Sequence, residues 1–165
     1  MEKTLEVINL LKDEGIINDY AICGAVATIF YIEPVTTYDL DIFVTLKGEK
    51  KSILSLSSIY EWFKEKRYGF DKEHIVIEGV PVQFIPVYNE LIEDAVSESV
   101  EKKYGNTITK VISPEYLISI MLQTNRAKDK ERVLRFIKEF EIDNDKLLVI
   151  LKKHNLIIKF NELKI

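Results

Sequence analysis

The chain has 165 residues, of which 47% are hydrophobic and 30% charged, and this composition predicts one globular domain with enough apolar material for a core. Its net charge is −4, so RNA or DNA could bind only at a local basic patch. Cys23 is the single cysteine, which excludes an intramolecular disulfide and a thiolate metal cluster and favours the reducing cytoplasm. No apolar run reaches about 18 residues, so we expect no membrane span.

The first half of the chain predicts helices around two strands. Apolar residues at helical spacing indicate an amphipathic helix that ends at Gly15. Residues 20–23 read as a short strand that stops at Gly24, and 25–31 as a buried helix closed by Pro34. The next strand covers 37–44, with Gly48 at its exit, and a further helix follows and ends at Gly69. The apolar residues of that helix, which we assign to the core, are Ile53, Leu54, Leu56, Ile59, Tyr60, Trp62 and Phe63.

The second half begins with a predicted hairpin of strands 74–77 and 80–85, joined at Glu78-Gly79. This register sets Ile77 opposite Val80 and leaves His74 beside Gln83. Asn89 is expected to cap a short helix, and Gly105-Asn106 to turn a second hairpin.

Three helices are predicted after residue 112. Ser113-Pro114 is a strong helix start, because Ser is a good cap and Pro suits the first helical position. Apolar residues at 133–140 indicate a second helix, and 146–153 a third that starts from Asp143 or Asn144. The fold class is therefore α+β, a mixed sheet with flanking helices and a helical C-terminal end. We expect a single domain over 1–165, with its core at about 1–112 and C-terminal helices at about 113–165.

Asp39 and Asp41 are the candidate metal ligands. In an extended segment, side chains two residues apart share a face, and Mg²⁺ (or Mn²⁺) prefers carboxylate oxygens completed by water and phosphate. The spacing alone is more often that of a solvated sheet face. Gly24 supports a metal site at these aspartates, because the N–H groups at the start of the helix that follows it can hold the phosphate of a metal-bound nucleotide. The alternative explanation for Gly24 is a simple bend between a strand and a helix.

In this arrangement the chain resembles the nucleotidyltransferase superfamily, which has a DNA polymerase beta-like fold. The resemblance rests on Gly24-Ala25, a helix, and then the segment TYDLDIFV at 37–44. Two further segments, VISPEYL at 111–117 and NRAKD at 125–129, resemble the C-terminal region of AbiEii-type and minimal prokaryotic members. The resemblance extends by ordered motifs from about residue 20 to 140.

The resemblance implies a function and a set of site residues. Asp39 and Asp41 would bind the catalytic metals, and Gly24 and Ala25 would contact phosphate through their backbone. Lys128 would approach the nucleotide phosphates, and the predicted nucleotide-binding set is completed by Thr37 and Arg126. The activity implied is transfer of a nucleoside monophosphate from a nucleoside triphosphate to an acceptor hydroxyl of RNA, protein or a small molecule. A toxin-antitoxin setting, with an antitoxin partner, is one expectation of this similarity.

Gln83 departs from the superfamily pattern. Members usually carry a third carboxylate on a later strand, and the run PVQFIP at 81–86 has Gln83 at that position. An amide carries no charge and cannot act as a general base. His74, beside Gln83, is the candidate substitute, although a lone histidine is more often structural. The alternative function is a catalytically weakened nucleotide-binding or protein-interaction module on the same fold.

A basic patch could assist phosphate binding near the aspartates. Its alternative explanation is a solvated helix face, because charge runs on helices are usually of that kind. The four residues of the patch are Arg126, Lys128, Lys130 and Arg132.

Overall fold

The computed structural model describes residues 1–32, 37–46 and 56–163. Helices and strands alternate through its first two thirds, and only helices follow, which confirms the α+β class. The elements are α1 (Glu2–Asp13), β1 (Asp19–Ile22), α2 (Gly24–Ile29), β2 (Leu40–Thr45), α3 (Ser57–Glu65), β3 (Gly69–Asp71), β4 (His74–Ile77), β5 (Val80–Pro86), α4 (Glu90–Ser97), β6 (Val100–Tyr104), β7 (Thr107–Val111), α5 (Pro114–Thr124), α6 (Ala127–Glu139), α7 (Asn144–Lys153) and α8 (Ile157–Asn161).

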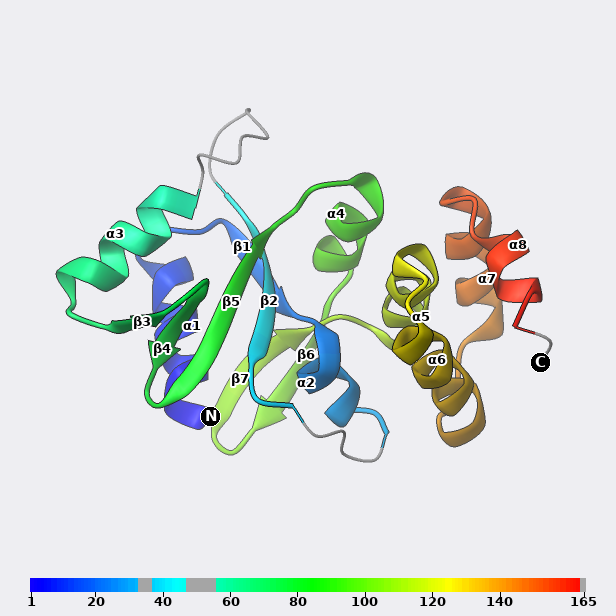
Figure 1. Cartoon of the computed structure of the whole chain (residues 1–165), viewed down its shortest axis with the longest axis horizontal. Coiled ribbons are helices and arrows are strands. Elements are labelled where there is room, and N and C mark those ends of the chain that lie inside the picture. The colour runs from blue at the N-terminus through cyan, green and yellow to red at the C-terminus, as the bar shows by residue number, and fades with distance from the viewer. Residues whose placement is uncertain (33–36, 47–55, 164–165) are drawn as a thin grey trace.

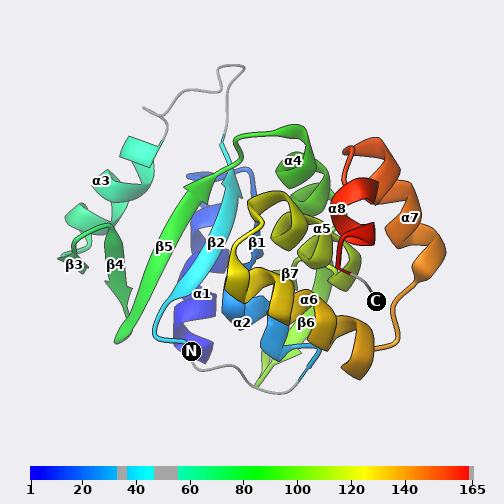
Figure 2. The ribbon, with the colours of Figure 1, turned by 45° about the vertical axis from the view of Figure 1, so that its right-hand side comes forward.

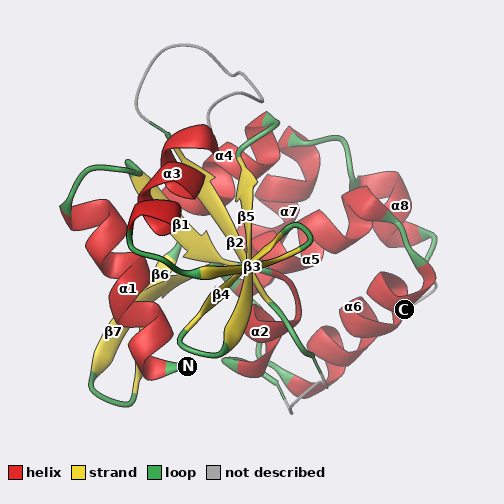
Figure 3. Cartoon of the chain, turned by 60° about the vertical axis from the view of Figure 1, so that its left-hand side comes forward, coloured by secondary structure: helices red, strands yellow, loops and turns green. Residues whose placement is uncertain are grey.

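The strands form one mixed sheet in the order β3-β4-β5-β2-β1-β7-β6. β2 pairs with β5, and β1 with β7, in parallel, whereas the other neighbours are antiparallel. Figure 3 shows the strands fanning out from one another, as the right-handed twist of strands requires. The parallel pairing of β2 with β5 places Asp41 opposite Gln83, so two residues that are 42 positions apart meet on adjacent strands.

The helices divide into two groups around the sheet. Figure 1 shows α1 and α3 to the left of strands β5 and β2, and α5 to α8 to their right. Helices α2 and α4 lie between the sheet and α5, because both contact β2 and also contact α5. The C-terminal helices are therefore held close to the sheet through α2 and α4.

The core forms where these helices bury their apolar faces. Leu5, Ile8 and Leu11 of α1 are fully buried, as expected for one face at helical spacing, and each such side chain contributes about 1.5–3 kcal/mol of transfer free energy. Trp62 and Phe63 of α3 are also core residues, as predicted. The Trp62 indole Nε1 donates to Glu14 Oε2 at 2.6 Å, which ties α3 to the end of α1.

Both predicted hairpins and the predicted Asn89 cap are confirmed, and of the two alternatives for the start of α7 the structure selects Asp143; Ser113 precedes α5 as predicted but makes no side-chain cap hydrogen bond. β4 and β5 pair with Ile77 opposite Val80, and β6 and β7 turn at residues 105–106. The Asn89 side chain accepts from Ile92 N at 2.9 Å at the start of α4, and the Asp143 side chain accepts from Lys146 N at 2.9 Å at the start of α7.

Two expectations differ from the structure, and one helix was not expected. The strand predicted at 37–44 begins only at Leu40, so Asp39 precedes it. Gly69 does not end the third helix, which stops at Glu65; it begins the edge strand β3, which pairs with β4. Helix α8 was not predicted; it has only five residues, and its Ile157 and Phe160 pack against the core while only partly buried. The predicted roles of Pro34, Gly48, Ile53 and Leu54 lie outside the described residues.

No helix in the described ranges is both long enough and apolar enough to cross a membrane.

Candidate active site

A cavity of about 260 Å³ opens between the sheet and the C-terminal helices. Strands β2 and β5 and the turn before α2 form one wall, while α5 and the start of α6 form the other, an arrangement that can be followed in Figure 2. We call this cavity the cleft. Its lining residues are Cys23, Gly24, Asp41, Phe43, Gln83, Ile85, Tyr88, Leu117, Ile120, Met121, Thr124, Arg126, Asp129 and Arg132.

Gly24 is required by the close approach of the Asp41 carboxylate. Its φ is +62°, in the left-handed region, and a Cβ built on it would lie 2.3 Å from Asp41 Oδ2. The Cys23 N–H donates to the Asp41 carbonyl at 2.9 Å, which holds the turn against β2. The turn that starts α2 and the carboxylate of β2 therefore form one unit, as the sequence motif implied.

The Asp41 carboxylate carries an electrostatic cost in this position. Burial raises the pKa of Asp41 above its ordinary value of 3.8, and the negative charge of Asp39 adds to the increase. Positive charge from His74, Arg126 and Lys128 acts in the opposite direction without cancelling it. A bound cation would remove this cost, because it favours the ionised carboxylate.

We expect the substitution Asp41→Asn to raise the free energy of unfolding at neutral pH. A carboxyl whose pKa is raised in the folded state stabilises the protein below its unfolded pKa, and this contribution is lost as the pH rises through the folded pKa. Asparagine cannot ionise, so its advantage over Asp41 appears above about pH 4 and vanishes below that pH. Thermal unfolding of both proteins from pH 3 to 8 tests this; a variant that is less stable than the parent at pH 7 contradicts it.

Asp39 lies beside Asp41 but outside the strand. Its Oδ1 accepts a hydrogen bond from Thr37 Oγ1 at 2.9 Å, and His74 Nε2 lies 3.6 Å from its Oδ2. That nitrogen is buried and has no hydrogen-bond partner among the described residues. The sequence predicted His74 beside Gln83, but the pairing of β4 with β5 ends at Ile75 and Val82. His74 lies one position beyond the last pair, close to Asp39.

Asp129 organises the positive charge on the helical wall. It is 1% exposed and accepts from Arg126 Nε at 2.6 Å and from Thr124 Oγ1 at 2.7 Å. The Nη1 atom of Arg132 lies 4.0 Å from Asp129 Oδ1. Burial would raise the pKa of Asp129, but the hydrogen bonds from Arg126 and Thr124 outweigh it and hold the pKa below its ordinary value. The ionised Asp129 therefore orients Arg126 at the cleft.

The predicted site residues are only partly brought together. Gly24, Asp41, Gln83 and Arg126 line the cleft. Asp39, His74, Lys128 and Ala25 do not line this cavity. Asp39, His74 and Lys128 nevertheless act on Asp41 through their charges, and Thr37 lines a different pocket.

Sequence reasoning missed Tyr88 as a cleft residue and gave no role to the Arg132–Asp129 contact. The spacing of residues 126, 129 and 132 on one helix face was a signal that could have revealed Asp129 as the partner of both arginines. Tyr88 follows β5 in a loop, where no periodicity could mark it.

The donor set fits a magnesium ion held by two carboxylates. Within the described part of the chain, no group of three His, Cys, Asp or Glu side chains could hold a metal ion. Mg²⁺ commonly binds through one or two carboxylates together with substrate phosphates and water, and Asp39 and Asp41 are the carboxylates that would serve in that mode. Burial raises the pKa of the Cys23 thiol well above its ordinary value, which excludes a reactive thiolate in the cleft.

No known protein-family profile matches this sequence, and no curated protein does. Among solved structures, the chain is similar to an antigenic nucleotidyltransferase-like protein from Paracoccidioides brasiliensis. The TM-score is 0.57 and the identity 15%, over 99% of this chain and 90% of the other. The chain has a nucleotidyltransferase-like fold. At this identity the similarity shows the fold alone, which is the fold that the motifs predicted, and does not extend to the AbiEii-type subgroup.

Proposed function

We propose that this protein binds a nucleoside triphosphate with Mg²⁺ in the cleft and transfers the nucleoside monophosphate to an acceptor hydroxyl. The observation that carries the proposal is the contact between Asp41 and the Gly24 turn, in a cavity whose opposite wall presents Arg126. Carboxylates for a cation and an arginine for phosphate are the groups that phosphoryl-transfer sites use.

Asp39 and Asp41 are the residues that would hold Mg²⁺, or Mn²⁺ in its place. When bound, the cation would neutralise phosphate oxygens and polarise the α-phosphorus for attack. Thr37, which donates to Asp39 Oδ1, orients this carboxylate.

Phosphate binding draws mainly on side chains. The first N–H groups of α2, including those of Gly24 and Ala25, lack intrahelical partners, but α2 spans only six residues and supplies a small dipole. Arg126, oriented by Asp129, and Lys128 add full charges near the carboxylates.

The nucleobase is assigned to the apolar part of the cleft. Tyr88 lines it with 55% of its surface exposed, and an exposed aromatic ring can stack on a base. Phe43 supports Tyr88 edge-on, with ring centroids 6.4 Å apart.

Calorimetry with each of the four common nucleoside triphosphates, with and without Mg²⁺, tests binding. Binding that requires the cation supports the proposal, and its absence for all four triphosphates overturns it. Release of pyrophosphate in the presence of acceptors then tests transfer. The toxin-antitoxin setting and an antitoxin partner stay predictions of the resemblance.

A nucleotide-binding module without turnover is the second candidate, and Gln83 favours it. Its position directly opposite Asp41 is where a third carboxylate would complete the metal site. For a weakened enzyme, Gln83→Asp is expected to raise the Mg²⁺ affinity and the rate of pyrophosphate release by at least about tenfold, because a third negative ligand is worth over 1 kcal/mol. If Gln83→Asp releases pyrophosphate no faster than the parent protein in the same assay, Gln83 does not stand in for a missing catalytic carboxylate.

A further inference from the structure

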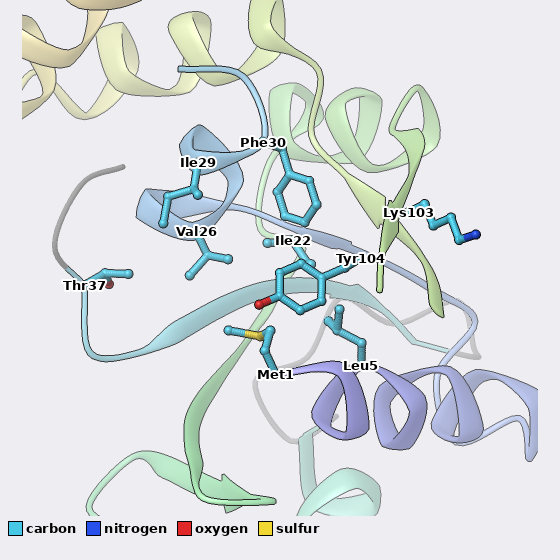
Figure 4. A pocket seen from close by; sticks show the side chains of 9 residues that line it. All are labelled: Met1, Leu5, Ile22, Val26, Ile29, Phe30, Thr37, Lys103 and Tyr104. Atoms are coloured by element: carbon cyan, nitrogen blue, oxygen red, sulfur yellow. The ribbon is translucent and has the colours of Figure 1, made fainter. Parts of the chain in front are cut away.

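A second, larger cavity lies on the other side of α2. Its volume is about 480 Å³, inside the range of about 300–1,000 Å³ that small-molecule sites occupy. The start of α1, the apolar face of α2 and the end of β6 enclose it, as Figure 4 shows. We call it the α2 pocket, and its lining residues are Met1, Leu5, Ile22, Val26, Ile29, Phe30, Thr37, Lys103 and Tyr104.

The lining of the α2 pocket is apolar except at a few points. Of the nine residues, six are aliphatic or aromatic hydrocarbons or a methionine, and no carboxylate is among them. Lys103 directs its ammonium group away from the other lining side chains in Figure 4. The interior therefore suits an uncharged body, because a buried charge without a partner would cost several kcal/mol.

Two hydroxyl groups provide the polar contacts. The Tyr104 hydroxyl points toward the side of the pocket where Thr37 and Met1 lie (Figure 4). The Thr37 hydroxyl lies on the path to the carboxylates, because it donates to Asp39 Oδ1 at 2.9 Å. One end of the pocket is thus polar and adjoins the proposed metal ligands.

Helix α2 connects the two cavities. Its first residue, Gly24, lines the cleft, while Val26, Ile29 and Phe30 line the α2 pocket. A ligand that fills the pocket with its apolar body and ends near Thr37 would present that end beside Asp39, where the proposed transfer takes place.

We infer that the α2 pocket binds the acceptor, and that the acceptor is an uncharged small molecule with an apolar body that ends in a hydroxyl group. This inference rests on the proposed function. RNA does not fit the pocket, because its phosphates would have to leave water for an apolar surface.

The transfer step balances with this acceptor. The hydroxyl oxygen forms a bond to the α-phosphorus, and the bond from that phosphorus to the oxygen bridging the β-phosphate breaks. Pyrophosphate leaves with the bonding electron pair, and the hydroxyl proton passes to water. The product is a phosphodiester of the alcohol and the nucleoside.

Phenylbutanol is a suitable probe, with butylbenzene as the matched molecule without a hydroxyl. Titration without nucleotide or metal, followed by methyl NMR, is expected to shift the methyl signals of Met1, Leu5 and Ile29. The alcohol should bind at least about threefold more tightly than the hydrocarbon, as one neutral hydrogen bond predicts. No saturable shift of these methyl groups, or equal affinity for both probes, overturns the inference.

Ile29→Trp fills the pocket from a partly exposed position, at 40% exposure, and is expected to weaken phenylbutanol binding by at least about tenfold. Ile108→Trp, at 57% exposure on β7, makes the same change outside the pocket and should leave binding unchanged. If Ile29→Trp does not fold, Ile29→Phe makes the smaller change. Equal affinity in a folded Ile29 variant and in Ile108→Trp contradicts the assignment.

Pyrophosphate release with Mg²⁺ and nucleoside triphosphate then tests the acceptor role. Phenylbutanol should stimulate release, and Ile29→Trp should abolish the stimulation. Release with RNA or protein acceptors but not with alcohols overturns the role. Since the probe titration needs neither metal nor nucleotide, a pocket that binds phenylbutanol in a protein that binds no nucleotide marks failure of the proposed function alone.

Discussion

Asp41→Asn is expected to abolish Mg²⁺-dependent nucleotide binding and to reduce pyrophosphate release by at least about 10³-fold, or ~4 kcal/mol of transition-state stabilisation. The variant keeps the shape of the side chain against Gly24 and removes only the charge that holds the cation. Asp39→Asn is expected to act in the same direction, because Asp39 is the second carboxylate of the pair.

The matched control is Asp145→Asn, an exposed aspartate in the first turn of α7. This substitution also removes one negative charge, but Asp145 does not line the cleft. Nucleotide binding and pyrophosphate release should therefore stay unchanged. Calorimetry and pyrophosphate release measure the effect, and the higher stability expected for Asp41→Asn separates lost chemistry from unfolding. Parent-like activity in Asp41→Asn would remove Asp41 from the proposed site.

Gly24→Ala is expected to lower activity by at least about 10²-fold, because an added Cβ would lie 2.3 Å from Asp41 Oδ2 and the carboxylate must move away. The variant should also unfold more easily by about 1–2 kcal/mol, since alanine is strained at a φ of +62°.

Gly79→Ala separates these two effects. Gly79 has a φ of +80°, but a Cβ built there has no neighbour within 4 Å. It should therefore show a similar loss of stability in denaturant unfolding and no loss of activity. If both variants lose activity equally, backbone strain and not displacement of Asp41 is responsible.

The local elements were predictable because their signals are local. The β4–β5 register followed from two β-rich runs around Glu78-Gly79, and the start of α4 from the capping residue Asn89. For α7 the sequence narrowed the start to Asp143 or Asn144, and the structure shows Asp143 as the cap. The edge strand β3 was not predicted, because its three residues are all exposed and therefore show no alternation of apolar and polar side chains. Asp39 was placed in a strand because alternation cannot mark where pairing begins.

In the candidate site, too, some features follow from the local sequence and others only from the folded chain. The motif gave Gly24, Asp41 and Gln83 as residues of the site, since a glycine turn and an alternating strand are each written in consecutive residues. The pairing of Arg126 with Asp129, the inclusion of Tyr88 and the contact of His74 with Asp39 depend on segments that meet only in the folded chain.

The sequence by itself therefore determined the α+β class, the two hairpins and the pair of aspartates beside a glycine turn, because each is set by short-range spacing and by residue chemistry. Only the tertiary structure decided that Gln83 lies across from Asp41, that Arg126 faces them, and that an apolar pocket adjoins Asp39 behind α2. The reason is physical: strand order and helix packing are chosen by burial of the whole core, which no single segment encodes.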